Sequence, residues 1–378
     1  MKILYLDHAT ELGGAEHSLL AFLRTLDRQQ FSPTLACPPG RLADRARALD
    51  VRVIDLSLER VKGRNPLRSI SRLRRGRAIL RGMLTSERFD VVHANTLRSA
   101  LYASGVARKS GARFLWHVRD YYMAGWARSA LLRRCDLAVV PSQFIASSLG
   151  RSAKVRIVPN GIDLAEVPRD EARAAFREGL GIHPGASVVG CVGRLLPWKG
   201  QRFFIDVVAR LAARLPDTRF LIVGGELFPT PGRDYPAELR DHARSQGVAE
   251  RILFTGHRDD PLAALGAMNV VVNCSGHEPF GRVLIEAMAC RRPVVAFRSG
   301  AVPEIVEDGS TGLLVQFPDT TGMAEAVYDL VRDHTRAEAY GEAGRHRVEA
   351  HFTLSASTRG IEAAYRELGA SLPTEREP

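Results

Sequence analysis

DVVHAN, residues 90–95, and LIVGG, residues 221–225, are two short runs in which apolar residues follow one another almost without a break. Such runs are typical of parallel strands that helices cover on both faces of the sheet. Similar runs alternate with amphipathic helical patterns along the chain, which predicts a doubly wound α/β fold. The predicted strands are 2–8, 32–37, 51–56, 89–94, 113–118, 137–141, 155–158, 187–192, 219–223, 251–255, 269–274, 293–297 and 312–316.

The pattern restarts near residue 187, after a stretch at 163–186 that contains proline, glycine and one charged helix. A chain of 378 residues is long enough for two domains. We therefore predict two Rossmann-like domains, residues 1–165 and residues 166–353. The segment 354–378 carries a last helix, which we expect to pack back on the first domain.

Composition narrows the class of protein. The five cysteines lack C-x-x-C spacing, which argues against a disulfide framework or a zinc site and for a reducing cytoplasm. No apolar run reaches the length of about 18–20 residues that a membrane span needs. The net charge is +11, yet only five of the 53 basic residues are lysines. Lys199 is the only lysine after residue 154, which draws attention to its loop.

SGHEPFGRVLIEAMA, residues 275–289, contains Glu278 directly before a predicted helix at 279–290 and Glu286 about two turns inside that helix. Pro279 suits the first turn of that helix, and a residue that precedes proline is pushed into an extended conformation. The free amides at the start of the helix form an anion site, and Gly281 lets a phosphate come close.

The spacing of the two glutamates separates two functions. At about 1.5 Å per residue, Glu278 and Glu286 lie on the order of 10 Å apart. The paired carboxylates of a glycosidase flank one bond at about 5–9.5 Å, so a glycosidase fits poorly. A nucleotide sugar fits better, with its diphosphate on the helix end and the glutamates accepting hydroxyl hydrogens.

VGRLLPWKG, residues 192–200, places Arg194 and Lys199 at the mouth of a predicted strand. Arginine grips phosphate oxygens bidentately, and lysine adds a compact point charge. The loop lacks G-K-[ST], so it is not a Walker A loop. The loop GGAEHSLL, residues 13–20, lacks G-x-G-x-x-G, which disfavours an NAD-dependent oxidoreductase.

The segment with Glu278 and Glu286 resembles the E-x7-E motif of the retaining glycosyltransferases of family 4, which have the two-domain GT-B fold. The resemblance covers nearly the whole chain, because further segments match family motifs in the same order. These segments are GGAEHSLL (13–20), DVVHANT (90–96), FLWHVRD (114–120), VPNGID (158–163), VGRLLPWKG (192–200) and PEIVEDGSTGLLV (303–315).

The resemblance implies two domains that face a cleft, and a role for each matching residue. The catalytic residues would be His117, Arg194, Lys199 and Glu278. The donor and its diphosphate would contact Gly13, Gly14, Arg194, Lys199, Pro279, Phe280, Gly281, Arg282, Val283 and Glu286. The nucleobase would lie near Gly225, His257 and Arg258, and the acceptor near Glu16 and Asp120. Structural roles are equally open for His93, Arg119 and Asp120.

The mechanism that the resemblance implies is transfer with retention of the sugar's configuration, with the departing phosphate as a candidate base for the acceptor proton. D-x-D and histidine-rich metal motifs are absent from the sequence, so we expect neither a cofactor nor a divalent metal. Arg194, Lys199 and the helix end would supply the positive charge instead.

The segment 60–84 carries nine basic residues and no acidic residue. Leu67, Ile70, Leu73 and Leu80 fall near one helical face, so the helix is either a normally packed surface helix or a peripheral contact with the inner face of an anionic membrane. Aromatic residues do not interleave with the basic run, so nucleic acid is not an expected partner. Two further functions stay open: a nucleotide-sugar epimerase and a non-catalytic protein that binds nucleotide sugars or polyanions.

Overall fold

The computed structural model describes residues 1–61, 66–119, 125–226 and 232–370. The chain divides into two compact units, Met1–Gly161 with Leu354–Pro378, and Ile162–Thr353. The sequence placed the junction between residues 165 and 166. Each unit is described by itself.

The first unit is built on a parallel sheet with the strand order β3-β2-β1-β4-β5-β6-β7 in the described residues. The strands are β1 (Lys2–Leu6), β2 (Ser32–Cys37), β3 (Arg52–Asp55), β4 (Val91–Ala94), β5 (Arg113–His117), β6 (Leu137–Val140) and β7 (Val155–Ile157). The helices are α1 (Gly14–Thr25), α2 (Arg41–Arg47), α3 (Pro66–Ser86), α4 (Leu97–Ala103), α5 (Gly125–Arg134), α6 (Gln143–Leu149) and α15 (Leu354–Ala370).

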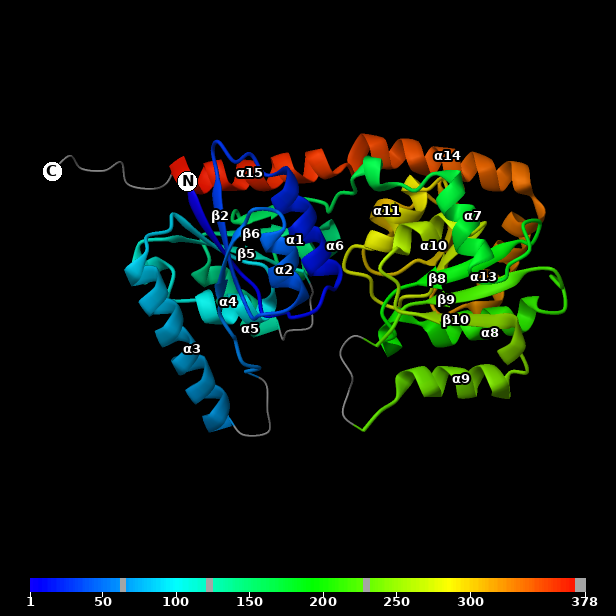
Figure 1. The fold of residues 1–378 in the computed structure, drawn as a ribbon, viewed down its shortest axis with the longest axis horizontal. Helices are drawn as coiled ribbons and strands as arrows, with labels where there is room; N and C mark the ends of the chain where they lie inside the picture. Colours follow the sequence, from blue (N-terminus) through cyan, green and yellow to red (C-terminus); the bar gives the residue numbers. More distant parts are fainter. Residues whose placement is uncertain (62–65, 120–124, 227–231, 371–378) are drawn as a thin grey trace. The chain divides into compact units, whose positions relative to one another are not determined.

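Both faces of this sheet are buried. Leu4 and Leu6 point into a core with α3, α4, α5 and α6, whereas Ile3 and Tyr5 point into a second core with α1, α2 and α15. Because alternate residues of β1 enter different cores, the strand must be apolar throughout, as the sequence pattern predicted. Figure 1 shows α15 beside α1, and Thr25 and Thr358 share a hydrogen bond of 2.7 Å between these helices.

The second unit has a parallel sheet with the strand order β10-β9-β8-β11-β12-β13 in its described residues. The strands are β8 (Val188–Val192), β9 (Arg219–Val223), β10 (Ile252–Gly256), β11 (Val270–Asn273), β12 (Val294–Phe297) and β13 (Gly312–Val315). The helices are α7 (Asp170–Glu178), α8 (Gln201–Leu211), α9 (Tyr235–Ser245), α10 (Pro261–Ala267), α11 (Arg282–Ala289), α12 (Val302–Ile305), α13 (Thr320–Arg332) and α14 (His334–His351).

Helices also cover both faces of this second sheet. Val189 belongs to a core with α8, α9 and α13, and its neighbour Val188 belongs to a core with α7, α10, α11 and α14. Helices on both faces of a parallel sheet define the doubly wound arrangement in each unit, so the predicted fold class is confirmed. Each predicted strand overlaps an observed one, and no end differs by more than two residues.

One predicted boundary is wrong. The helix expected at 279–290 is α11, which begins at Arg282 and ends at Ala289. Gly281 caps it with φ 101°, a left-handed conformation that favours glycine, so Pro279 and Phe280 lie in the loop before the helix. Proline fits a loop as well as a first helical turn, which is why the sequence did not separate the two cases.

Candidate functional site

The loops that follow β8, β9 and β10 are tied together at the carboxyl edge of the second sheet. Gly193 N–H donates to the Val223 carbonyl at 2.9 Å, and Gly224 N–H donates to the Gly256 carbonyl at 2.9 Å. Leu195 N–H donates to the Gly225 carbonyl at 3.1 Å. The loop with Arg194 and Lys199 is thus fixed beside the two loops that were predicted to hold a nucleobase.

Lys199 and Glu278 form an ion pair in which Nζ lies 2.7 Å from Oε2. Only 17% of the lysine side chain and 7% of the glutamate side chain are exposed. Lys199 ends a 3₁₀ turn after β8, and Glu278 lies in the loop after β11. A carboxylate and an ammonium at this distance make a charge-assisted hydrogen bond, which is stronger than a neutral one.

The backbone around Glu278 is held on two sides. Gly276 N–H donates to the Trp198 carbonyl at 3.0 Å, and Ala301 N–H donates to the Glu278 carbonyl at 2.8 Å. Gly300 has φ 56°, and a Cβ atom there would lie 2.2 Å from the Glu278 carbonyl oxygen. Only glycine therefore allows the loop before α12 to press against Glu278.

Glu286 forms an ion pair with Arg282. Arg282, four residues earlier on α11, donates to Glu286 Oε1 from Nε at 3.0 Å and from Nη2 at 2.7 Å. Val283 follows Arg282 on the same helix, and the Phe280 side chain packs against Phe352 in the core. Neither the Lys199–Glu278 pair nor the Arg282–Glu286 pair was predicted from the sequence, although the i, i+4 spacing of Arg282 and Glu286 indicates such a pair.

The other residues of this unit that were predicted to contact the donor or its nucleobase lie in the adjoining loops. Arg194 is half-buried, and its carbonyl accepts a hydrogen bond of 2.8 Å from Gln201 Nε2. A Cβ atom on Gly225 would lie 3.1 Å from His257 Cβ, so these two residues are in contact range. Arg258 donates from Nε to Asp260 Oδ1 at 3.0 Å and from Nη2 to Asp260 Oδ2 at 3.1 Å. Its guanidinium lies over the Phe176 ring.

The first unit carries a row of buried polar rings across β1, β4 and β5. Tyr365 of α15 donates from its hydroxyl to the Tyr5 hydroxyl at 2.8 Å and lies 2.6 Å from His93 Nδ1. His93 Nε2 lies 3.2 Å from His117 Nδ1. Burial lowers the pKa of His93 to about 3, and burial together with Arg119 and His93 lowers the pKa of His117 well below its usual range. Both rings are therefore neutral.

The tautomers of both histidines follow from one assignment, that the Tyr365 hydroxyl donates to Tyr5. With that assignment, the Tyr365 oxygen accepts from His93 Nδ1–H. His93 Nε2 is then a lone pair, which accepts from His117 Nδ1–H. His117 Nε2 is left as a buried acceptor, and it has no hydrogen-bond partner among the described residues.

A second row of polar side chains follows β1, β4 and β5, at the carboxyl edge of the first sheet. Asn95 donates from Nδ2 to Asp7 Oδ2 at 2.7 Å, and Arg119 Nη2 donates to Asn95 Oδ1 at 2.8 Å. Arg119 Nη1 also donates to Asn160 Oδ1 at 2.8 Å. These contacts give Arg119 a structural role, and the sequence singled out neither Asp7 nor Asn95.

Glu16 caps the start of α1. Its Oε2 accepts from Gly13 N–H at 2.8 Å, and the side chain is buried. Burial, followed by the charge of Asp7, raises the pKa of Glu16 to about 7. Gly14 begins α1, whereas Asp120, the other predicted acceptor-side residue, lies outside the described residues.

The described part of the chain lacks both a metal-binding cluster and a helix that could cross a membrane. Residues 1–61, 66–119, 125–226 and 232–370 contain no group of three or more histidine, cysteine, aspartate or glutamate side chains placed to hold a metal ion. Over the same ranges, no helix is both long enough and apolar enough to cross a membrane.

Comparison with known families matches both units. The model for the glycosyl transferases group 1 matches residues 186–333, and the model for Glycosyltransferase Family 4 matches residues 12–166. The chain is 39% identical over 265 residues to the GDP-mannose-dependent alpha-(1-6)-phosphatidylinositol monomannoside mannosyltransferase of Mycolicibacterium smegmatis. That match covers 64% of this chain and 67% of the relative.

A second relative matches from end to end. The lipopolysaccharide core biosynthesis glycosyltransferase LpsE of Rhizobium meliloti is 29% identical over 382 residues, which covers 99% of this chain and 100% of LpsE. Among solved structures, HepE of Anabaena in complex with UDP and glucose has a TM-score of 0.86 at 24% identity, with 97% of this chain and 99% of that chain covered. WaaG, a glycosyltransferase involved in lipopolysaccharide biosynthesis, has a TM-score of 0.73 at 15% identity, with 96% and 98% covered.

Proposed function

We propose, on the premise that the chain belongs to the family 4 glycosyltransferases with the GT-B fold, that it moves a sugar from a nucleoside diphosphate sugar to an acceptor hydroxyl. The observation that carries the proposal is the Lys199–Glu278 pair beside the start of α11. The pair places a cation, a carboxylate and free helix amides at one edge of one sheet.

Both partners of the Lys199–Glu278 pair keep hydrogen-bonding groups that a substrate can use. An ammonium has three N–H donors, and Glu278 takes one of them, so two are left for phosphate oxygens. Glu278 uses Oε2 for Lys199, and its Oε1 can accept a sugar hydroxyl. Glu278 thus holds Lys199 in place for the leaving group while it contacts the donor.

The diphosphate binds at the amino end of α11. The first amides of a helix lack carbonyl partners within the helix and carry partial positive charge, which suits phosphate. Gly281 lies at this position with no side chain, and Arg194 and Lys199 supply formal charge from the loop after β8. Stabilising the departing diphosphate is the largest catalytic contribution that these groups make.

The transfer retains the configuration at the sugar carbon and proceeds without a divalent metal. The departing phosphate, held by Arg194 and Lys199, accepts the proton of the attacking hydroxyl on the face from which it leaves. His117 Nε2 offers a buried lone pair to a substrate hydroxyl, because its Nδ1–H is committed to His93. Activity that persists in excess EDTA and an α-linked product from an α-linked donor are the expected results; loss of activity in EDTA or an inverted product contradicts this part of the proposal.

The acceptor is a lipid-linked glycan, and the enzyme reaches it through α3. The relative from Mycolicibacterium smegmatis is named for a phosphatidylinositol monomannoside, and LpsE is named for the lipopolysaccharide core. The carboxyl half of α3 is anchored in the core by Leu80 and Leu84, whereas Leu67 and Ile70 near its start are 77% and 47% exposed. Figure 1 shows this start of α3 extending away from the sheet of its own unit.

A donor panel tests the proposal. Binding of GDP, UDP, ADP and the corresponding hexose donors is measured by calorimetry, and turnover with lipid-linked acceptors is measured in parallel. We expect one nucleotide series to bind, and Lys199→Ala to lower turnover by at least tenfold. Unchanged turnover in Lys199→Ala contradicts the assignment. Donor consumption without an acceptor would instead indicate the epimerase that the sequence left open.

A further inference from the structure

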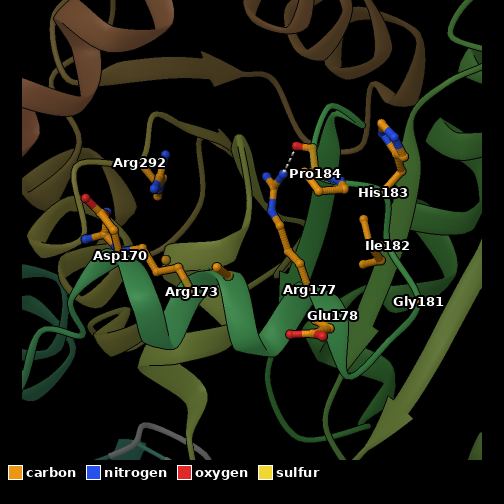
Figure 2. Close-up of a pocket in the computed structure, with 11 residues that line it drawn as sticks. Asp170, Arg173, Arg177, Glu178, Gly181, Ile182, His183, Pro184 and Arg292 are labelled. Atoms are coloured by element: carbon orange, nitrogen blue, oxygen red, sulfur yellow. Dashed lines mark hydrogen bonds and ion pairs between the residues drawn. The ribbon is translucent and has the colours of Figure 1, made fainter.

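The second unit contains a pocket of about 690 Å³ that lies apart from the donor-side loops. Its lining includes Arg173 and Arg177 of α7, Arg292, Gly266 of α10, and the turn that contains Ile182. Figure 2 shows Arg292 on the side of the pocket where Asp170 and Arg173 lie, and His183 on the other side. Three arginines therefore line one hollow.

The pocket lies at the amino edge of the sheet. The turn at 181–184 leads into β8, and Arg292 directly precedes Pro293 and β12. Lys199 and Glu278, by contrast, follow β8 and β11. Because all strands of this sheet are parallel, the residues before the strands and the residues after them lie at opposite edges. The pocket is thus a separate site from the one proposed for the donor.

The three arginines differ in how their guanidinium groups are satisfied. Arg177 is held entirely by the protein, with Nε on the Ala267 carbonyl at 2.8 Å and Nη2 on Asn269 Oδ1 at 2.8 Å. It also donates from Nη1 to the Pro184 carbonyl at 3.2 Å, which is the contact drawn in Figure 2. Arg177 has a structural role and fixes the wall of the pocket.

Arg292 and Arg173 are not satisfied in this way. The buried Nε of Arg292 has no hydrogen-bond partner, and no ion pair joins its guanidinium to a carboxylate of the described residues. The buried Nε of Arg173 is also without a partner, and it lies against Gly266, where a Cβ atom would come within 2.9 Å of it. Buried polar groups without partners are rare in folded proteins and cost free energy.

The acidic residues near the pocket do not balance this charge. Asp170 pairs with Arg173 Nη1 at 3.0 Å, but the aspartate side chain is 92% exposed, and an exposed ion pair contributes little. Glu178 is exposed as well. Burial, reinforced by the positive charge of Arg173, lowers the pKa of Arg292 to about 10, which leaves the group charged at neutral pH.

We propose that this pocket binds a phosphate ester, with Arg292 and Arg173 as the residues that grip it. A guanidinium presents paired N–H donors that match two oxygens of a phosphate, and both groups have donors to spare. The volume admits a headgroup or a sugar phosphate, and Ile182 and Gly266 offer apolar surface beside the charge. The proposal is independent of the transfer reaction, because its ligand binds at the other edge of the sheet.

The test is the effect of inorganic phosphate on the melting temperature of the full chain. The variants are Arg292→Gln, its neighbour Arg291→Gln as the control, and Lys199→Ala to remove phosphate binding at the donor site. Arg291 is half exposed and pairs with Glu342 on α14, so it matches Arg292 in position but not in environment. Calorimetric titration with phosphate gives the affinities.

We expect phosphate to stabilise wild type, Arg291→Gln and Lys199→Ala, and to bind Arg292→Gln at least tenfold more weakly. In phosphate-free buffer, Arg292→Gln is expected to melt at the same or a higher temperature than wild type, because it removes a partly buried charge whose Nε has no hydrogen-bond partner. Equal phosphate stabilisation of Arg292→Gln and wild type overturns the proposal. Arg173→Gln, expected to weaken binding in the same way, serves if Arg292→Gln does not fold.

A second arm separates a free phosphate ester from a lipid headgroup. Co-sedimentation with phosphatidylglycerol vesicles is compared for wild type and Arg292→Gln, both of which keep α3 intact. Weaker sedimentation of Arg292→Gln assigns the pocket to a headgroup, and equal sedimentation with phosphate stabilisation assigns it to a free ester. If Arg292→Gln matches wild type in both arms, the pocket is not an anion site.

Discussion

Lys199 Nζ donates to Glu278 Oε2 at 2.7 Å, and this contact joins the loop after β8 to the loop after β11. The two residues are 79 positions apart, so no spacing rule connects them. In the proposed reaction, this pairing holds the Lys199 ammonium in place for the leaving group. The backbone of Glu278 is held separately, because Ala301 N–H donates to its carbonyl and Gly300 lets the neighbouring loop come close.

Glu278→Gln tests this pairing. The amide keeps the size of the carboxylate but loses its charge, so Lys199 is held less firmly. A hydrogen bond to a charged group contributes about 1.5–3 kcal/mol, so kcat/KM should fall by about 10- to 150-fold. Glu325→Gln, which breaks the exposed Arg214–Glu325 pair, is the control and should change kcat/KM by less than twofold. Equal kinetics for Glu278→Gln and the control would contradict the role.

The ring row of the first unit predicts the tautomers of two histidines. Nitrogen-detected NMR of the histidine side chains should show both His93 and His117 protonated at Nδ1, because Tyr365 directs its own proton to Tyr5. Tyr365→Phe removes the acceptor for His93 Nδ1–H and should shift both tautomer populations, whereas Tyr328→Phe in the second unit should leave them unchanged. A wild-type spectrum with the proton on His117 Nε2 refutes the arrangement, whatever the enzyme's activity.

Glu16 predicts a pH dependence of stability. Its pKa rises from 4.5 to about 7 on folding, so between these values the folded state holds a proton that the unfolded state has lost. Stability contributed by this residue is therefore present below pH 4.5 and falls as the pH rises towards 7. Glu16→Gln cannot ionise and keeps an acceptor for Gly13 N–H. The free energy of unfolding of this variant, minus that of wild type, should increase between pH 5 and pH 8; a difference that does not change with pH contradicts the buried position.

The sequence predicts structure that depends on local patterns, but not contacts between residues that are far apart in the chain. The continuous apolar runs predicted the strands, because a parallel strand buried on both faces has no polar positions to vary. The start of α11 was misplaced because Gly281, not Pro279, ends the loop. The pairing of Lys199 with Glu278, of His93 with Tyr365, and the unpaired state of Arg292 depend on residues brought together by the fold, so no local pattern reveals them.

The start of α3 predicts binding to anionic vesicles. Leu67→Ser combined with Ile70→Ser removes two exposed apolar side chains, and full burial of each would contribute about 1.5–3 kcal/mol. Vesicle affinity should drop by at least tenfold, with the melting temperature unchanged because neither side chain is in the core. Ile157→Ser, on the exposed edge of β7, is the matched control. Affinity that depends on neither α3 residue excludes this helix as the membrane contact.

A crystal structure with a nucleoside diphosphate bound would test the proposed donor site most directly. We expect the diphosphate at the amino end of α11, with its oxygens on the amides that follow Gly281 and within hydrogen-bond distance of Arg194 and Lys199. A diphosphate found elsewhere on the second unit, or found there with Lys199 turned away from it, would contradict the assignment.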